Sequence, residues 1–462
     1  MAMSEFSGFN IGRQMFNTFQ VAMNVTGHNI ANASNPAYTR QRAVIQASLP
    51  MSSLAGVGNI GGGSQVVMIQ RLRSTYVDAQ RTNTQGNLGA STVLSQGLTQ
   101  LQSLWNEGSG QGISTSVDAL SSDLSTLSTQ PDSLSLRQGV LDDAGALAQQ
   151  IQQKYADLSN LQRQSDQQVG SAVDEINNLS SQVAQLNTEI AGQLAIGQQP
   201  NDLLDQRQAA VEKLGDLSGA QSALMDNGMI NLNIGGHWLV SQDRAASISS
   251  SPDAARPGLT VFSWADNGQV FTPVAGEAQA GLELRDQDIP DAMAKLDSLA
   301  VNLMADYNGL QAGGYALNAA APGGTQFFTG TGAQDIAVDP ALAANPAALA
   351  AAGSPSAPGD GNQAAAMAAL NGNPSPGLGQ SYTDALATWA SEAGSSAQLA
   401  DQQHSTQQSL MTQLDSLTAS ISGVNINEEA INLSEYQQAY QAGAHYIAAL
   451  DTMIQSLLSE IK

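Results

Sequence analysis

Residues that could act as catalysts or metal ligands are few in this chain and lie far apart. Its four histidines, His28, His237, His404 and His445, stand alone, and no His-Glu-x-x-His pattern joins two of them. Cysteine is absent, which excludes thiolate catalysis, disulfides and zinc sites that need sulfur. The Gly-x-Ser-x-Gly pattern of serine hydrolases is also missing. We therefore expect no enzyme activity, no metal site and no cofactor.

Two segments resemble ligand-binding loops only in part. Gly58–Gly63 is rich in glycine but lacks the Lys-Ser/Thr pair that holds phosphate, so we expect a hinge. Asp286, Asp288 and Asp291 have the density of calcium ligands, but the glycine and glutamate that complete a calcium loop are missing, so we expect a solvated turn. A distant carboxylate pair for glycoside cleavage within 221–375 stays an alternative, because sequence does not show which side chains meet.

The composition of the 462 residues favours long helices over a compact enzyme. Charged residues make up 12% and aromatic residues 5%, so the cores should consist of Ala, Leu, Val and Ile. The net charge of −24 repels phosphate backbones, so we expect no nucleic-acid partner. Neither a membrane-spanning apolar run nor the pattern of a cleaved signal peptide is visible. We therefore expect no membrane insertion, and export without a cleaved signal.

Apolar residues recur every seven positions at both ends of the chain, as in helices that pack side by side. The N-terminal stripe consists of Phe9, Phe16, Met23 and Ile30, with Phe19 between them. The C-terminal stripe consists of Ile426, Leu433, Tyr440, Ile447 and Ile454, with Tyr436, Leu450 and Leu457 at the second position. Asn29, Asn32, Asn35 and Pro36 should end the first helix. Each stripe needs a partner, either within the chain or in another copy.

The two ends also carry opposite charge. Residues 1–81 hold six arginines against Glu5 and Asp78, whereas 421–462 hold five carboxylates against Lys462. Opposite charges steer the pairing of surfaces, so we expect Glu428, Glu429 and Glu435 to promote assembly.

The chain between these ends changes character twice. Residues 82–220 read as helical, and 221–375 contain strand patterns, including a hairpin at Met229–Val240, further strands at 259–262 and 269–271, and a helix at 292–311. The helical pattern returns near residue 380. We predict a multidomain, mainly α protein. Residues 1–82 and 421–462 form a coiled inner-tube domain, 83–220 with 376–420 a helical domain, and 221–375 an inserted outer α+β domain with strands and loops.

Three stretches resemble the bacterial flagellar axial proteins, and most closely the hook-associated junction proteins among them. They are Asn29–Arg40, Gln199–Arg207, and Ser422–Ala430 with Tyr436–Ala442. The residue at Ala37 departs from the family, which usually has glycine there; a positive φ would strain alanine.

The resemblance implies a structural protein that is exported through the flagellar type III apparatus and joins hook to filament. The implied partners are copies of itself in a tube, the hook protein, the second junction protein and through it the filament, and an export chaperone acting on the C-terminal helix. The implied location is the extracellular flagellum. The residues expected at the assembly interface are Phe9, Phe16, Phe19, Met23, Ile30, Asn29, Asn32, Asn35, Pro36, Tyr38, Arg40, Ile426, Leu433, Tyr436, Tyr440, Ile447, Leu450, Ile454 and Leu457.

Other functions are compatible with the same patterns. A secreted stalked binding protein or adhesin would use the helices as a stalk and 221–375 as the ligand head, and its terminal helices would bury each other within one molecule. Flagellin and the second junction protein are alternatives within the axial class, but Gln199–Arg207 argues against both.

Overall fold

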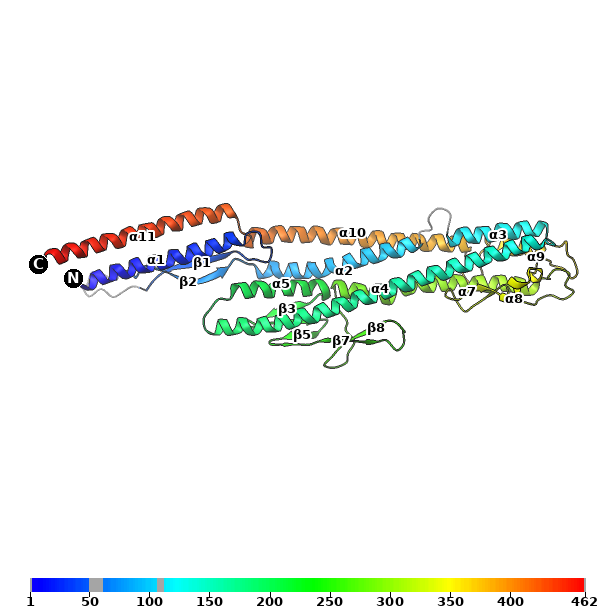
Figure 1. Ribbon diagram of the computed structural model, residues 1–462, viewed down its shortest axis with the longest axis horizontal. Helices are drawn as coiled ribbons and strands as arrows, with labels where there is room; N and C mark the ends of the chain where they lie inside the picture. The colour runs from blue at the N-terminus through cyan, green and yellow to red at the C-terminus, as the bar shows by residue number, and fades with distance from the viewer. Residues whose placement is uncertain (1, 50–60, 106–111, 461–462) are drawn as a thin grey trace.

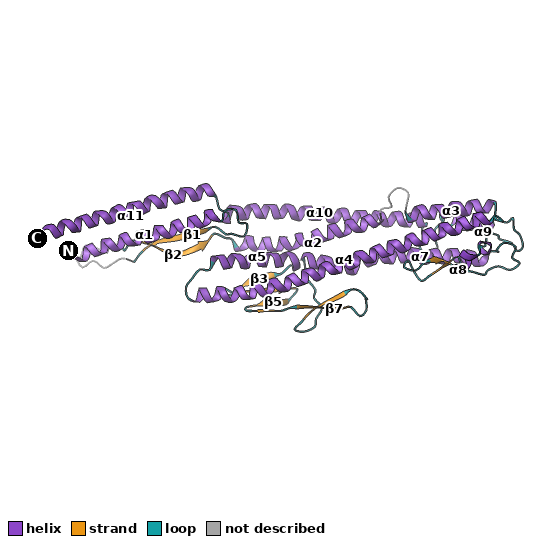
Figure 2. Cartoon of the chain, in the orientation of Figure 1, coloured by secondary structure: helices purple, strands orange, loops and turns teal. Residues whose placement is uncertain are grey.

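The computed structural model describes residues 2–49, 61–105 and 112–460. Over these ranges the molecule is elongated, and its long helices run side by side (Figure 1). The first and last helices, α1 (Ala2–Ala31) and α11 (Ile426–Glu460), lie together at one end. The strands are short and lie beside α1 and in the middle of the chain (Figure 2). The predicted fold class, mainly α with long terminal helices and a β-containing middle region, is confirmed.

Between α1 and α11 the chain forms the following elements. The helices are α2 (Thr75–Trp105), α3 (Ile113–Thr129), α4 (Leu134–Ala195), α5 (Asn201–Ser218), α6 (Gly276–Glu283), α7 (Ile289–Gly313), α8 (Pro340–Ala344), α9 (Asn362–Ala369) and α10 (Tyr382–Ser422), with a π-helical turn at Leu284–Asp288 and a 3-10 turn at Pro346–Ala348. The strands are β1 (Gln41–Ala47), β2 (Ser64–Arg71), β3 (Gln221–Leu224), β4 (Ile230–Ile234), β5 (His237–Ser241), β6 (Arg244–Ala245), β7 (Ile248–Pro252), β8 (Thr260–Trp264), β9 (Phe328–Thr329) and β10 (Ala337–Val338).

We call α1, α11 and the β1–β2 ribbon the terminal unit. The two helices are antiparallel, since Gly8 of α1 faces Leu450 and Asn29 binds Glu429. The ribbon is antiparallel with a bulge between Val44 and Ile45, and it packs on a different side of α1. Both stripes predicted from the sequence therefore find their partner within one molecule.

We call residues 75–422 the shaft, which contains two hydrophobic cores. One core joins the first half of α4 to α3, α7, α9 and the start of α10. The other joins the second half of α4 to α5 and strands β4, β5, β7 and β8. Because α4 is 62 residues long, its apolar face contributes to both cores and ties them into one rod.

The strands of the middle region form three separate antiparallel sheets, of which the smallest pairs the two-residue strands β9 and β10. The largest has the order β3-β4-β5-β6, and the third pairs β7 with β8. Gly235 and Gly236 connect β4 to β5 with φ of 57° and 92°, the conformation that a tight hairpin turn requires and that glycine adopts without strain. The hairpin predicted at Met229–Val240 is thereby confirmed.

Some predicted elements differ from the structure or fall outside it. The strand expected at 269–271 is present only as an isolated antiparallel bridge between Val270 and Ser263, with hydrogen bonds to β8 at Gln269 and Phe271. Pro273 follows without an N–H to extend the ladder. Residues 221–375 contribute to both cores of the shaft. The domain boundaries at 82, 220, 375 and 420 stay predictions. Half of the hinge expected at Gly58–Gly63, residues 58–60, lies outside the described residues.

Candidate assembly site and its polar junction

The terminal unit meets the shaft in a cluster of buried polar side chains, which we call the polar junction. At its centre is Asn29, 1% exposed, in the last turn of α1. Its amide nitrogen donates to the carbonyl of Gln41 at 2.8 Å and to Glu429 Oε2 at 2.9 Å. Its Oδ1 accepts from the N–H of Gln41 at 3.0 Å and from the Tyr38 hydroxyl at 2.8 Å. One side chain thus joins the end of α1, the start of β1 and the start of α11.

Arg40 extends this junction toward α10 and α11. Its guanidinium donates to Glu429 Oε1 at 2.8 Å and pairs with Glu428 Oε2 at 2.9 Å. Its backbone N–H donates to the carbonyl of Ser422, the last residue of α10, at 2.9 Å. Because Glu429 is 2% exposed, its charge depends on Arg40 and Asn29 for compensation. The charge attraction predicted between the two ends therefore operates within one chain at Glu428 and Glu429.

The start of α5 holds the turn between α1 and β1 against the shaft. Asp205 accepts from the N–H of Thr39 at 3.0 Å and from its hydroxyl at 2.7 Å, and it also pairs with Arg71 of β2. Asn201 donates to Gln41 Oε1 at 3.1 Å and to the carbonyl of Ile69 at 3.0 Å. These bonds clamp both strands of the ribbon to α5.

Burial shapes the electrostatics of this cluster. Burial raises the pKa of Tyr38 well above its ordinary value, and the charges of Asp202, Asp205 and Glu429 add to the effect. The Tyr38 hydroxyl therefore keeps its proton and remains a donor to Asn29. Burial lowers the pKa of Arg207 to about 10, with a further contribution from the charge of Arg71, so Arg207 stays charged at neutral pH.

The Asn-rich turn after α1 contains Asn32, Asn35, Pro36 and Ala37. The amide of Asn32 donates to the carbonyl of His28 at 3.0 Å and so caps the helix end. The N–H of Ala37 donates to Asn35 Oδ1 at 3.1 Å, and Ala37 is not among the residues with positive φ. The strain considered for alanine at this position is absent, because the turn is closed by an asparagine side chain. A cleft of about 550 Å³ lies between this turn and α5.

The apolar residues of the two stripes form a seam between α1 and α11. The rings of Phe16 and Tyr440 meet edge to face at 4.7 Å, and those of Phe19 and Tyr436 lie 6.2 Å apart. Gly12 of α1 has no room for a β-carbon, which would lie 2.6 Å from Ile447 Cγ1, so the helices approach closely there. Other seam positions are half-buried, and they are Phe9, Met23, Ile30, Leu433, Leu450 and Ile454.

One predicted interface residue lies apart from this seam, and another cannot be compared with it. Ile426, at the first turn of α11, is 56% exposed. Leu457 belongs to α11, but its side chain lies outside the described part of the structure. Sequence reasoning missed Thr39, Gln41, Arg71, Asn201 and Asp205 of the polar junction. Asn201 and Asp205 stood within the recognised Gln199–Arg207 stretch, which was the available signal. That these residues form contacts between copies stays a prediction.

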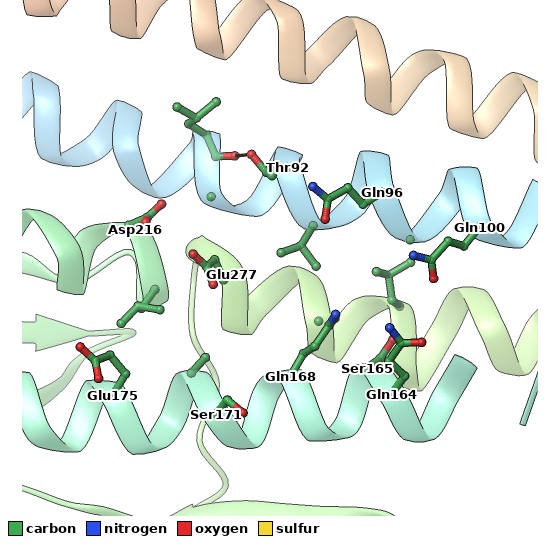
Figure 3. A pocket seen from close by; sticks show the side chains of 18 of the residues that line it. Thr92, Gln96, Gln100, Gln164, Ser165, Gln168, Ser171, Glu175, Asp216 and Glu277 are labelled. Atoms are coloured by element: carbon green, nitrogen blue, oxygen red, sulfur yellow. Dashed lines mark hydrogen bonds between the residues drawn. The ribbon is translucent and has the colours of Figure 1, made fainter. Parts of the chain in front are cut away.

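A groove of the shaft lies away from the terminal unit, among α2, α4 and α6, and measures about 630 Å³. Figure 3 shows Gln96 and Gln100 of α2 facing Gln164 and Gln168 of α4 across it. Within the described ranges, no group of three or more His, Asp and Glu side chains is placed to hold a metal ion.

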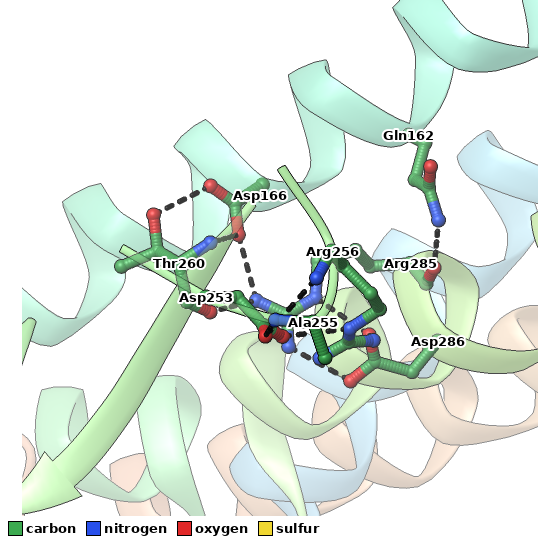
Figure 4. A network of polar contacts seen from close by, with 8 residues as sticks. All are labelled: Gln162, Asp166, Asp253, Ala255, Arg256, Thr260, Arg285 and Asp286. Carbon is green, nitrogen blue, oxygen red and sulfur yellow. Dashed lines mark hydrogen bonds and ion pairs between the residues drawn. The ribbon is translucent and has the colours of Figure 1, made fainter. Parts of the chain in front are cut away.

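The aspartates considered as calcium ligands belong to an ion-pair network instead. Asp286 lies in the π-helical turn and binds Arg285 at 2.8 Å, while Arg285 also reaches Asp166 of α4 at 2.7 Å (Figure 4). Asp166 in turn accepts from the N–H and hydroxyl of Thr260 in β8. The expected solvated turn is therefore wrong, because Asp286 and Arg285 help to fasten the β7–β8 hairpin to α4.

Two models of known protein families match parts of this chain. The family model for the flagellar hook-associated protein FlgK helical domain matches residues 98–328, half of the chain. The model for the C-terminal region of the flagellar basal body rod FlgEFG proteins matches residues 406–460, which include α11. Over the ranges that the structure describes, no helix has the length and hydropathy needed to cross a membrane.

Individual relatives align along nearly the whole chain. It is 25% identical to flagellar hook-associated protein 1 of Salmonella typhimurium, over 96% of this chain and 98% of that protein. It is 23% identical to the protein of the same name from Bacillus subtilis, over 99% and 98%. The solved flagellar hook junction protein FlgK from Burkholderia pseudomallei shares the fold, with a TM-score of 0.65 at 16% identity over 74% of this chain and all of that one.

Proposed function

The chain belongs to the flagellar hook-associated protein FlgK family, a family of structural proteins of the hook–filament junction and not of enzymes, and we propose that it joins hook to filament by packing its terminal unit against copies of itself. Membership implies assembly with hook and filament components and a place in the extracellular flagellum. The finer assignments are proposals: a tube of copies, the hook protein on one side, the second junction protein on the other, and an export chaperone that acts on α11.

One observation of the structure supports this proposal most directly. The three stretches that resemble flagellar axial proteins are about 160 to 390 residues apart in sequence, yet Asn29, Thr39 and Arg40 of the first bind Asp205 of the second and Glu428 and Glu429 of the third. A binding protein with a plain stalk needs no such junction between stalk and body. The interface residues proposed for the tube remain those expected from the sequence, which include Asn29, Tyr38 and Arg40 of this junction.

The alternative of a stalked adhesin predicted that the terminal helices bury each other within one molecule, and α1 and α11 do so. The family model and the near full-length relatives decide against it. The same relatives favour hook-associated protein 1 over flagellin and over the second junction protein.

Complementation tests the proposal. A strain that lacks its own hook-associated protein 1 should regain filaments and swimming when it expresses this chain. Leu433→Asp should abolish this rescue, because a carboxylate in the half-buried seam costs several kcal/mol of desolvation, on the order of 2–4. Secretion of the variant into the medium should persist.

Ser434→Asp is the matched control, since Ser434 is the next residue of α11 and is exposed. It should rescue as well as the unsubstituted chain. Normal filament assembly with Leu433→Asp would show that the seam is not needed for incorporation. A failure of the unsubstituted chain to enter flagella at all would contradict the proposed role.

A further inference from the structure

Four charged side chains of the terminal unit take part in no ion pair among the described side chains. Among the described residues, Arg40 pairs with Glu428 and Glu429, whereas Arg71, Arg73 and Arg81 pair with acids at or near the shaft. Arg13 of α1 and Arg42 of β1 have no carboxylate partner within these ranges. Glu435 and Asp451 of α11 have no cationic partner there either. Two cations on the N-terminal side and two anions on α11 therefore remain available to another molecule.

Arg42 lies on a ribbon with an exposed apolar surface. Ile45, Val67 and Met68 are 37%, 44% and 42% exposed, and Val67 stands at the bulge where the register of the ribbon shifts. Arg42 itself is exposed and donates a hydrogen bond to Gln70 Oε1, at 3.3 Å, on the neighbouring strand. Over the described residues the ribbon pairs with no third strand, and a two-stranded ribbon with exposed aliphatic side chains is a surface that commonly pairs with another chain.

Glu435 lies on a flank of α11 that is apolar as well. Ile431, Tyr446 and Met453 are 60%, 40% and 56% exposed. At about 100° per residue these three side chains and Glu435 fall within a helical arc of about 60°, beside the seam that faces α1. This flank therefore combines exposed apolar area with an unpaired carboxylate.

The ribbon and the flank begin at the same level of α1, because Asn29 binds Gln41 at the start of β1 and Glu429 near the start of α11. Arg42 lies one residue beyond Gln41, and Glu435 lies six helical residues beyond Glu429, a rise of about 9 Å. A small shift along the axis between two neighbouring molecules would bring the cation of one beside the anion of the other.

We propose that the β1–β2 ribbon of one copy docks on the flank of α11 of the neighbouring copy, with Arg42 paired to Glu435. The proposal rests on the proposed assembly of copies and names the contact through which they meet. It uses two different patches of the same molecule, so each copy can bind one neighbour through its ribbon and another through α11, as a ring or helical tube requires. The opposite charges favour this pairing over ribbon with ribbon or flank with flank.

A charge swap in the full chain tests the contact in assembled flagella. Arg42→Glu should place two carboxylates together and lower incorporation into purified flagella about tenfold, and Glu435→Arg should do the same with two cations. The double variant Arg42→Glu with Glu435→Arg should restore incorporation. Arg163→Glu, at an exposed position of α4 in the shaft, is the control and should incorporate normally.

Cross-linking locates the contact independently of charge, and the absence of native cysteine keeps its background low. Two differently tagged chains, one carrying Gln70→Cys and the other Gln438→Cys, are co-expressed and oxidised. A mixed dimer should form in flagella and not in the secreted monomers. Gln20→Cys, on the exposed polar side of α1, replaces Gln70→Cys as the control and should give no dimer.

The possible results distinguish a wrong ribbon–flank contact from a wrong proposed function. Normal incorporation of both single charge variants, or no mixed dimer in flagella that contain the chain at normal amounts, overturns the ribbon–flank contact and leaves the junction role intact. Single defects that the double variant does not repair also overturn it. Absence of even the unsubstituted chain from flagella overturns the proposed function itself.

Discussion

At the scale of single residues, the side chain of Asn29 forms four hydrogen bonds at the centre of the polar junction. It donates to Gln41 and Glu429 and accepts from Gln41 and Tyr38 while almost fully buried. Asn29→Asp removes both donors and sets a carboxylate against Glu429, so we expect a loss of about 2–3 kcal/mol in the unfolding free energy of the terminal unit. Hydrogen exchange of α1 and α11 measures this loss. Asn24→Asp, at an exposed position of the same helix, should leave exchange unchanged; equal effects of both variants would contradict the role of Asn29.

At the same scale, Asp288 should make the stability of the folded protein depend on pH. Burial raises its pKa to about 6, assisted by the charges of Glu283 and Asp291, and its Oδ2 has no hydrogen-bond partner among the described residues. The folded state thus binds this proton more tightly than the unfolded state, whose pKa is about 3.9. Stability contributed by the protonated form is present below about pH 4 and is lost as the pH rises through about 6.

Asp288→Asn should remove that loss. We expect it to be more stable than the unsubstituted chain by about 1 kcal/mol at pH 7.5, a value reduced for solvent screening of a partly exposed group, and no more stable at pH 4. Thermal unfolding at the two pH values measures the difference. Asp174→Asn, exposed on α4, should change neither value. A stability gain of Asp288→Asn that is the same at both pH values would show that charge is not its cause.

The sequence predicted one half of the polar junction and not the other. Asn29, Tyr38 and Arg40 were identified because they lie in a continuous recognisable stretch. Their partners Asp205 and Glu429 lie in the other two recognised stretches, and Glu429 was expected to attract the opposite end of the chain. Nothing in a helical pattern says which residue each carboxylate meets. The three aspartates at 286–291 show the same limit, since the pairing of Asp286 with Arg285 depends on a π-helical turn that spacing does not reveal.

At the scale of elements, the close approach of α1 and α11 depends on a glycine in the seam. A β-carbon at Gly12 would lie 2.6 Å from Ile447, whereas one at Gly27, in the same helix, would meet nothing within 4 Å. Alanine favours a helix over glycine by about 1 kcal/mol at both positions. We therefore expect Gly27→Ala to stabilise the terminal unit and Gly12→Ala to lose that gain through the clash.

Proteolysis by chymotrypsin, which cuts beside the aromatic residues of the seam, compares the two variants. Gly12→Ala should be cut faster within α11 than the unsubstituted chain, and Gly27→Ala more slowly. Slower cutting of both would mean that the seam tolerates wider spacing and that helix propensity alone decides its stability.

Seven-residue spacing predicted that both terminal helices carry an apolar stripe, and the structure contains both helices with near the expected bounds. Spacing does not say which stripe each will meet. The partner became clear only from contacts such as Phe16 with Tyr440. The hairpin at β4–β5 was predictable for a different reason, because a Gly-Gly pair between two alternating segments leaves few other conformations.

At the scale of the whole molecule, the terminal unit and the shaft are built differently. The shaft contains two cores whose large side chains are fully buried, including Tyr307, Phe327 and Ile151. The seam between α1 and α11 is lined by half-buried residues, and the ribbon and the α11 flank leave further apolar side chains exposed. Burial of apolar area is the main source of stability, so the terminal unit should open more readily than the shaft.

Composition and seven-residue spacing predicted a mainly helical protein whose two ends form one domain. They did not predict that α4 would supply both cores, nor that residues 221–375 would be divided between those cores. Such a division depends on which faces of a long helix meet which loops, and apolar residues of similar type occupy both regions. The roles of the shaft and of 221–375 in the flagellum stay predictions.

Chymotrypsin footprinting of the same chain as secreted monomer and in purified flagella, mapped by mass spectrometry, tests most directly whether assembly buries the terminal unit. We expect residues 2–49 and 426–460 to be cut first in the monomer and to become as resistant as the shaft in flagella. Trypsin is unsuitable, because no Lys or Arg occurs between Lys295 and Lys462. Equal cutting of these ends in both states, while the chain is present in flagella, would contradict the central claim that copies assemble through the terminal unit.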